Sequence, residues 1–117
     1  IAPRVHNSGH HTLQSCETSQ FEQHLRAILG MDLGDSSIKT PTIMYNILGP
    51  KTFQGEYNVL IKKEDNIHLK MYGKLESKPQ RKIGHVNIVD KENLGIEELF
   101  NQVENLKRNL VIEPKEA

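Results

Sequence analysis

The first residues of the chain gather side chains that could bind an anion. Residues 4–12, RVHNSGHHT, include one arginine, three histidines, an asparagine and a glycine. The guanidinium of Arg4 offers a planar fork that matches a phosphate or a carboxylate. His6, Asn7 and Ser8 add short hydrogen-bonding groups, and the glycine lets the backbone approach a ligand closely. An anion or substrate site explains this segment, and a solvated Asn-Ser-Gly turn explains it equally well.

The histidines of this segment, His6, His10 and His11, also raise the question of a metal site. Zinc needs three or four ligands on a backbone that fixes tetrahedral geometry. These histidines lie in a polar loop, and Cys16 is the single cysteine of the chain. We therefore favour an anion site over zinc, and we interpret Cys16 as a small buried residue of a protein from a reducing, cytoplasmic setting.

A second group of cations occurs in KLESKPQRK, where Lys74, Lys78, Arg81 and Lys82 lie close together in the sequence. A flexible basic loop between two strands suits the binding of a phosphate monoester, although many basic loops are only solvated. The 15 basic and 15 acidic residues of the chain give a formal net charge of zero, which argues against nucleic acid or an acidic membrane surface as partner. Any anion binding must therefore come from a local cluster.

A helix is predicted after residues 4–12, which form the opening loop. Ser19 and Glu22 have the spacing of a capping box, and Gly30 lies where the helix would end. The apolar residues between them fall on one helical face. They are Phe21, Leu25, Ile28 and Leu29.

Three later segments, 42–49, 66–73 and 83–90, have the composition or the alternation of strands. The polar stretch between the last two is typical of a hairpin loop. His85 lies on the last strand, where we expect a hydrogen-bonded structural group. Segment 57–65, YNVLIKKED, is ambiguous, and we interpret it as a short helix.

The two ends of the chain differ in character. Residues 1–5, IAPRV, read as a short strand without a partner nearby in the sequence, so its sheet would lie upstream. The chain starts without methionine, which we interpret as a processed or truncated start. Residues 95–110 place apolar side chains on one helical stripe, with acidic residues early and basic ones late. Residues 111–117 are charged, and we expect them to be frayed.

Taken together, "IAPRVHNSGHHTLQSCETSQFEQHLRAILG", "MYNILG" and "MYGKLESKPQRKIGHVNIV" closely resemble the C-terminal third of the N5-carboxyaminoimidazole ribonucleotide synthetase family, of the PurK type. The resemblance implies an α+β chain that is the C-terminal part of an ATP-grasp fold. It further implies that residues 1–34 end the ATP-grasp core. Residues 35–112 would form a C-terminal subdomain, followed by a charged tail over 113–117.

The resemblance also implies a reaction. Aminoimidazole ribonucleotide, ATP and bicarbonate would give the N5-carbamate, ADP and phosphate, with magnesium bound alongside ATP. Phosphorylation of bicarbonate would give carboxyphosphate, and this species or the carbon dioxide that it releases would meet the substrate amine. The resemblance implies a cytoplasmic homodimer of purine biosynthesis, with no nucleic acid or membrane as partner.

By position, the resemblance assigns the opening loop to the reacting centre, where Arg4, His6 and Asn7 would hold the ribonucleotide and the carboxylating species. Ser8 and His10 are weaker candidates in the same loop. The basic loop would bind the phosphate of the ribonucleotide. Its matching residues are Lys74, Arg81 and Lys82.

The magnesium-binding glutamate of this family comes just upstream of the residue that matches Ile1, and the pocket for ATP lies further upstream. The resemblance therefore implies that this chain alone has no metal ligand and does not turn over. Two alternatives stay open. One is the formate-dependent glycinamide ribonucleotide transformylase, which has an analogous "PRxH" loop, and the other is a non-catalytic module for phosphosugar binding or dimerisation.

Overall fold

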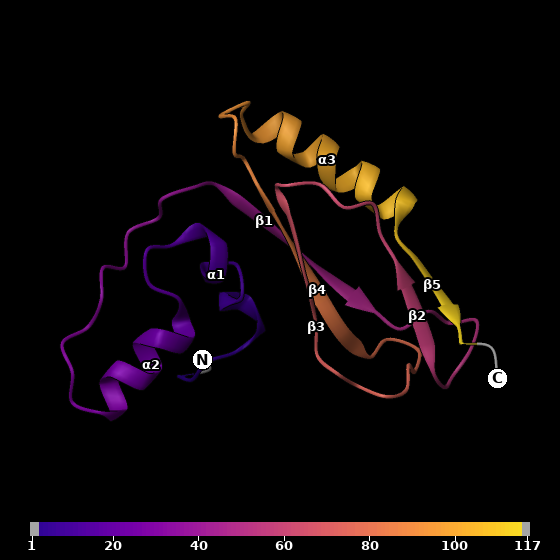
Figure 1. The fold of residues 1–117 in the computed structure, drawn as a ribbon, viewed down its shortest axis with the longest axis horizontal. Helices are drawn as coiled ribbons and strands as arrows, with labels where there is room; N and C mark the ends of the chain where they lie inside the picture. Colours follow the sequence, from indigo (N-terminus) through magenta and orange to yellow (C-terminus); the bar gives the residue numbers. More distant parts are fainter. Residues whose placement is uncertain (1–2, 116–117) are drawn as a thin grey trace.

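A three-stranded antiparallel sheet forms the centre of the molecule in this computed structural model, which describes residues 3–115. Its strands are β1 (Thr42–Leu48), β3 (Ile67–Met71) and β4 (Lys82–Val89), in the order β1-β4-β3 (Figure 1). All three strands were predicted from the sequence, as was the hairpin connection between β3 and β4. Because β4 is the central strand, it pairs along its length with a neighbour on each side.

Helix α3 (Ile96–Asn109) covers one face of this sheet, as predicted from its apolar stripe (Figure 1). Glu97 and Glu98 lie in its first turn, and Lys107 and Arg108 lie in its last, which suits the helix dipole. The helix and the sheet enclose the apolar core. Its buried members are Ile47, Ile83, Val86, Ile88, Leu99, Val103 and Leu106.

A second, two-stranded sheet joins β2 (Tyr57–Leu60) to β5 (Val111–Pro114). The prediction of a short helix over 57–65 is therefore wrong, because Tyr57 and Val59 alternate with more exposed neighbours in an extended strand. The prediction of a frayed end is also wrong for residues 111–114, which are held by this pairing. Residues 116 and 117 lie outside the described part of the chain.

Residues 3–41 form helices and loops, with one isolated β-bridge between Cys16 and Ile38. A short 3-10 turn (Asn7–Gly9) is followed by α1 (Thr12–Ser15) and α2 (Gln20–Ile28). Ser19 is the N-cap of α2, as predicted, since the amide of Glu22 donates to Ser19 Oγ at 3.2 Å. The Glu22 carboxylate accepts from Arg26 at 2.8 Å. The predicted strand over 1–5 is not found in its described part, residues 3–5, where no neighbouring strand supplies hydrogen bonds.

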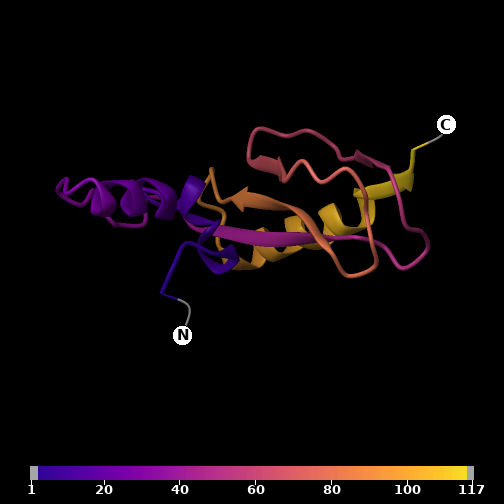
Figure 2. The same ribbon diagram turned by 90° about the horizontal axis from the view of Figure 1, so that it is seen from below.

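Helix α2 projects from the rest of the molecule and leaves its apolar face in solvent (Figure 2). Leu25, Ile28 and Leu29 are 58%, 67% and 69% exposed. The radius of gyration is 16.0 Å, whereas a compact domain of this length would have about 13 Å. The first turn of α2 contacts the opening loop through Gln20 and Phe21. Within residues 3–115, no helix combines the length and the apolar character needed to cross a membrane.

Candidate functional site

Strand β4 is buried on both faces, and its two faces have different partners. Val86 and Ile88 belong to the apolar core under α3, whereas His85 and Asn87 point to the opposite face. His85 is 2% exposed and Asn87 is 0% exposed because the opening segment covers them. The Asn87 side-chain amide donates to the carbonyl of His10 at 3.0 Å and also to Gln14 Oε1. The polar face of β4 is therefore the floor on which the opening loop rests.

The two sequence clusters predicted to bind substrate meet at Asn7. Lys82, at the start of β4, places its ammonium 3.4 Å from Asn7 Oδ1. Asn46 on β1 exchanges two amide hydrogen bonds with Asn7, at 2.7 and 3.1 Å. These contacts fix the Asn7 side chain between two strands and put a cation beside it. An amide and an ammonium group side by side form a setting suited to an anionic ligand.

The basic loop between β3 and β4 is anchored along its backbone, so it is less flexible than the sequence suggested. Gly49 N donates to the Arg81 carbonyl at 2.7 Å, and Gln80 N donates to the Gly49 carbonyl at 3.0 Å. A Cβ atom on Gly49 would lie 1.9 Å from the carbonyl oxygen of Lys78, so only glycine permits this close approach. Lys74 Nζ donates to the Lys82 carbonyl at 2.7 Å. Lys74 and Lys82 are therefore held at one end of the sheet.

The other residues predicted to bind substrate lie further from the contact between Asn7 and Lys82. Arg81 directs its guanidinium to the carbonyl of Glu76 at 3.3 Å, in the loop and not toward Asn7. Arg4 and Ser8 are exposed, and the Arg4 carbonyl contacts His6 Nδ1 at 3.0 Å. The structure thus brings together Asn7 and Lys82, with Lys74 and His6 nearby through backbone contacts.

An aromatic cluster missed by sequence reasoning lies beside Asn7. The His10 ring stacks on Phe21 at 5.6 Å between centroids and lies 5.0 Å from the ring of His85. Tyr72 Oη and His85 Nδ1 form a hydrogen bond at 2.8 Å, which confirms the hydrogen-bonded structural role expected for His85. Burial raises the pKa of Tyr72. The alternation of polar and apolar residues in "GHVNIV" was the available signal, but alternation normally indicates a solvated polar face.

The histidines of the opening segment have partners other than a metal. Within residues 3–115, no three His, Cys, Asp or Glu side chains are grouped so that they could hold a metal ion. His11 Nδ1 lies 2.7 Å from Ser15 Oγ, and His10 contacts aromatic rings. Cys16 is buried, as predicted.

His10 and His85 should make the stability of the protein depend on pH. Burial lowers the pKa of His10, and the nearby charges of His6 and Lys82 lower it further. Burial also lowers the pKa of His85, with additional contributions from His10 and Lys70. An unfolded histidine has an ordinary pKa of 6.5 and takes up its proton before the folded one does. The free energy of unfolding should therefore be highest above pH 6.5 and should fall as the pH decreases through the window below it.

Urea unfolding at pH values on either side of 6.5 measures this effect. His85→Gln should reduce the difference in the free energy of unfolding between the two conditions. His68→Gln is the matched control, because His68 lies exposed on the neighbouring strand β3. An equal pH dependence in the wild type and His85→Gln would contradict the prediction.

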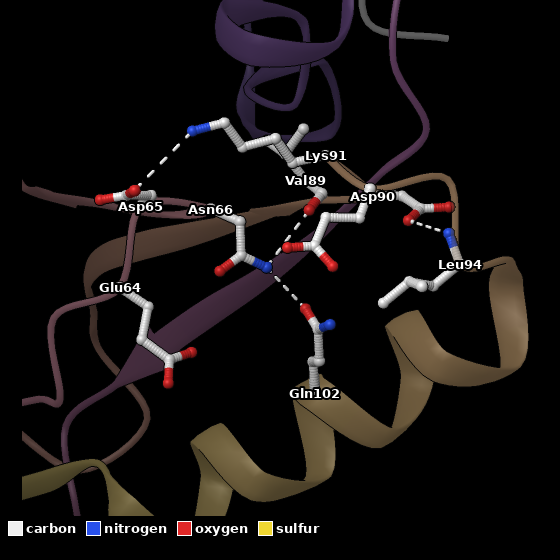
Figure 3. A pocket seen from close by; sticks show the side chains of 9 residues that line it. Glu64, Asp65, Asn66, Val89, Asp90, Lys91, Leu94 and Gln102 are labelled. Atoms are coloured by element: carbon white, nitrogen blue, oxygen red, sulfur yellow. Dashed lines mark hydrogen bonds and ion pairs between the residues drawn. The ribbon is translucent and has the colours of Figure 1, made fainter.

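A hollow of about 680 Å³ opens at the far end of β4, between the sheet and the start of α3 (Figure 3). Asp90 accepts hydrogen bonds there from the amides of Leu94 and Gly95, at 2.8 and 3.0 Å. Asn66 Nδ2 donates to Gln102 Oε1 at 2.6 Å. These contacts hold the loop before α3. The lining carries four carboxylates and one lysine, which makes it unsuitable for a phosphate.

Comparison with known proteins identifies this fold. Residues 42–99 match the sequence model of the phosphoribosylaminoimidazole carboxylase C-terminal domain, and residues 1–21 match that of the ATP-grasp domain. The N5-carboxyaminoimidazole ribonucleotide synthase of Bacillus subtilis is 44% identical over 103 residues, which are 87% of this chain and 27% of that protein.

Two solved structures show the same fold. The Thermotoga maritima N5-carboxyaminoimidazole ribonucleotide synthetase has a TM-score of 0.88 and 38% identity over 98% of this chain and 32% of its own. The Aspergillus clavatus synthase, solved with ADP and 5-aminoimidazole ribonucleotide, has a TM-score of 0.71 and 30% identity over 90% of this chain and 28% of its own.

These matches put the chain in the ATP-grasp class of proteins. Within that class it belongs to the N5-carboxyaminoimidazole ribonucleotide synthetase family, whose C-terminal part it resembles. The chain spans only about a quarter to a third of the length of the relatives compared here.

Proposed function

We propose that this chain is the substrate-binding C-terminal part of an ATP-dependent ligase. The ligase would carboxylate 5-aminoimidazole ribonucleotide with bicarbonate, giving N5-carboxyaminoimidazole ribonucleotide, ADP and phosphate. The contact between Asn7 and Lys82 carries the proposal, because it joins the two segments that the family resemblance assigns to one ribonucleotide. The Aspergillus clavatus relative, whose structure holds that ribonucleotide, supports the choice of substrate.

The residues of the site would act by positioning and by charge. Lys82 and Lys74 would hold the phosphate of the ribonucleotide, with Arg81 available to swing in from its carbonyl contact in the loop. Asn7 and His6 would hold the carboxylating species near the substrate amine, with Arg4 and Ser8 at the exposed edge. As the nitrogen–carbon bond forms, the carbon–oxygen bond of carboxyphosphate would break. The leaving phosphate would keep the bonding electrons and accept the proton that the amine loses.

ATP and magnesium would be bound mostly outside these residues. The part of the chain that the structure describes offers no group of three carboxylate, histidine or cysteine side chains for a cation. We therefore assign the nucleotide and the metal to the longer portion that the relatives possess. A cytoplasmic homodimer for the whole protein also stays a proposal.

The exposed face of α2 supports the proposed division of the chain. Residues 1–34 would complete an ATP-grasp core, and residues 35–112 would form the C-terminal subdomain, with β5 extending it by two residues before the tail. An apolar stripe as exposed as that of Leu25, Ile28 and Leu29 normally has a partner. The remainder of an ATP-grasp domain is the partner we propose, because the ATP-grasp match ends within α2.

The chain alone should not turn over. With ATP, magnesium, bicarbonate and 5-aminoimidazole ribonucleotide present, phosphate release should equal that of a blank without protein. A version joined to the ATP-grasp portion of the Bacillus subtilis relative should release phosphate and form the carbamate. Phosphate release by the 117-residue chain alone would overturn the proposed division of labour.

Substrate identity is tested separately with the joined protein. It should respond to 5-aminoimidazole ribonucleotide and not to glycinamide ribonucleotide with formate, which is the substrate pair of the alternative enzyme. The matched family favours the first substrate. A preference for glycinamide ribonucleotide would overturn the proposal, and binding without turnover would favour the non-catalytic module.

A further inference from the structure

Gln20, the first residue of α2, forms two hydrogen bonds from its side-chain amide to the backbone of the opening loop. Gln20 Oε1 accepts from the amide of His6 at 3.2 Å, and Nε2 donates to the carbonyl of His6 at 2.9 Å. These two contacts fix which end of the amide is nitrogen. The second hydrogen on Nε2 then faces His10 Nδ1 at 2.8 Å, so this ring nitrogen must be unprotonated.

The loop is shaped around this amide. A Cβ atom on Gly9 would overlap Gln20 Oε1, so glycine at position 9 leaves the space that the Gln20 amide occupies in this arrangement. The backbone amide of Gln20 donates to Thr12 Oγ1 at 2.9 Å, and Thr12 Oγ1 donates to the Gly9 carbonyl at 2.6 Å. Helix α2 thus holds the loop on one side while Asn87 of β4 holds it on the other.

We propose that Gln20 is a positioning residue of the substrate site: its amide sets the backbone at His6, which places the neighbouring Asn7 beside Lys82, and it keeps Nδ1 of His10 unprotonated. The effect on substrate rests on the function proposed above, whereas the effect on His10 does not. Sequence reasoning treats this position as ordinary helix, because nothing in the local pattern distinguishes Gln20 from a solvated first-turn residue.

Gln20→Glu tests the proposal because it changes hydrogen-bonding capacity with little change of shape. The introduced carboxylate cannot donate, so it would face the His6 carbonyl and the lone pair of His10 Nδ1 without a proton between them. The His10 contact is restored if His10 takes up a proton. The titratable groups around His10 are His6, Lys82, His85 and Tyr72. In the wild type, burial opposes proton uptake by His10, and His6 and Lys82 oppose it further.

Helix α2 supplies a matched control. Gln23 makes the same type of clamp, with Nε2 donating to the Gly34 carbonyl at 2.8 Å and Oε1 accepting from the Gly34 amide at 2.9 Å. Gln23→Glu therefore breaks an equivalent pair of bonds on the same helix, away from the opening loop. Gln20→Met is the second variant, since it keeps the length of the side chain and removes both donors at every pH.

The first measurement is an NMR titration of His10 in the 117-residue chain. We expect Gln20→Glu to raise the pKa of His10, and Gln23→Glu to leave it unchanged. Equal titration of His10 in the wild type and Gln20→Glu would overturn the clamp. This measurement requires neither ATP nor substrate, so it stands whether or not the proposed function is right.

The second measurement is the pH profile of kcat/KM for 5-aminoimidazole ribonucleotide in the joined protein. We expect Gln20→Glu to lower this value about tenfold or more above neutral pH and to recover part of it in acid, with the KM for ATP unchanged. Gln20→Met should show the loss without recovery. Identical profiles for Gln20→Glu and Gln23→Glu would overturn the positioning role. Failure of the wild type to carboxylate would overturn the proposed function and, with it, the substrate part of this inference.

Discussion

Replacing Lys82 with alanine should raise the KM for 5-aminoimidazole ribonucleotide about 10- to 100-fold in the protein joined to an ATP-grasp portion. A hydrogen bond to a charged group contributes about 1.5–3 kcal/mol, which corresponds to this range. The ammonium of Lys82 lies 3.4 Å from Asn7 Oδ1, at the point where the opening loop meets the end of the basic loop. The KM for ATP should stay nearly unchanged, because no role in ATP binding is assigned to this end of the sheet.

Steady-state kinetics with each substrate varied in turn measures the effect. Lys63→Ala is the matched control, since Lys63 is an exposed lysine between β2 and β3 and its loss changes the net charge equally. Lys82→Arg keeps the charge and should lose less than alanine does. Equal losses for ATP and for the ribonucleotide would rule out a phosphate-binding role for Lys82.

Replacing Leu99 with alanine should lower the free energy of unfolding by about 2–5 kcal/mol. Leu99 is 1% exposed and lies in the core between α3 and the sheet, where truncation leaves a cavity. Because small domains have a total stability of about 5–15 kcal/mol, this change would remove a large part of it. Urea unfolding of the 117-residue chain, followed by circular dichroism, gives the value.

Leu75→Ala provides the comparison for Leu99→Ala. Leu75 is 83% exposed in the loop after β3, so the same chemical change there should alter the free energy of unfolding by no more than about 0.5 kcal/mol. Similar losses in both variants would mean that α3 does not seal the core. If Leu99→Ala unfolds altogether, Leu99→Met, which conserves volume, should cost less than about 1.5 kcal/mol.

The predictable part of the fold was the part governed by local pattern. The capping of α2 by Ser19, the stripe of α3 and the strands of the central sheet each leave a periodic signal within a few residues. The pair β2 and β5 leaves none, because Tyr57 pairs with Pro114 across most of the second half of the chain. When the pairing strand is unknown, the four residues YNVL are too few for their pattern to distinguish a strand from a helix.

Unusual polar and basic clusters marked Asn7 and Lys82 as candidates, and only the family resemblance assigned them a role. The structure places the two residues in contact; their roles in binding stay predictions. Asn46, Gln20 and Asn87 were missed because each lies in an ordinary strand or helix position. Their importance comes from burial against the opening loop, which depends on contacts between residues far apart in the sequence.

The residues of β4 that contact the opening loop are synthesised after the loop itself. The contacts from Asn87 to the loop join residues 77 and 73 positions apart, and the contact from Lys82 to Asn7 joins residues 75 apart. Synthesis delivers the loop before β4, which emerges only after β1 and β3 have been made. Contacts of such separation form slowly because the intervening chain must first be ordered. The opening loop is therefore among the last parts of this chain to acquire its native shape, and a nascent chain that stalls before β4 exposes the loop without its contacts to Asn87 and Lys82.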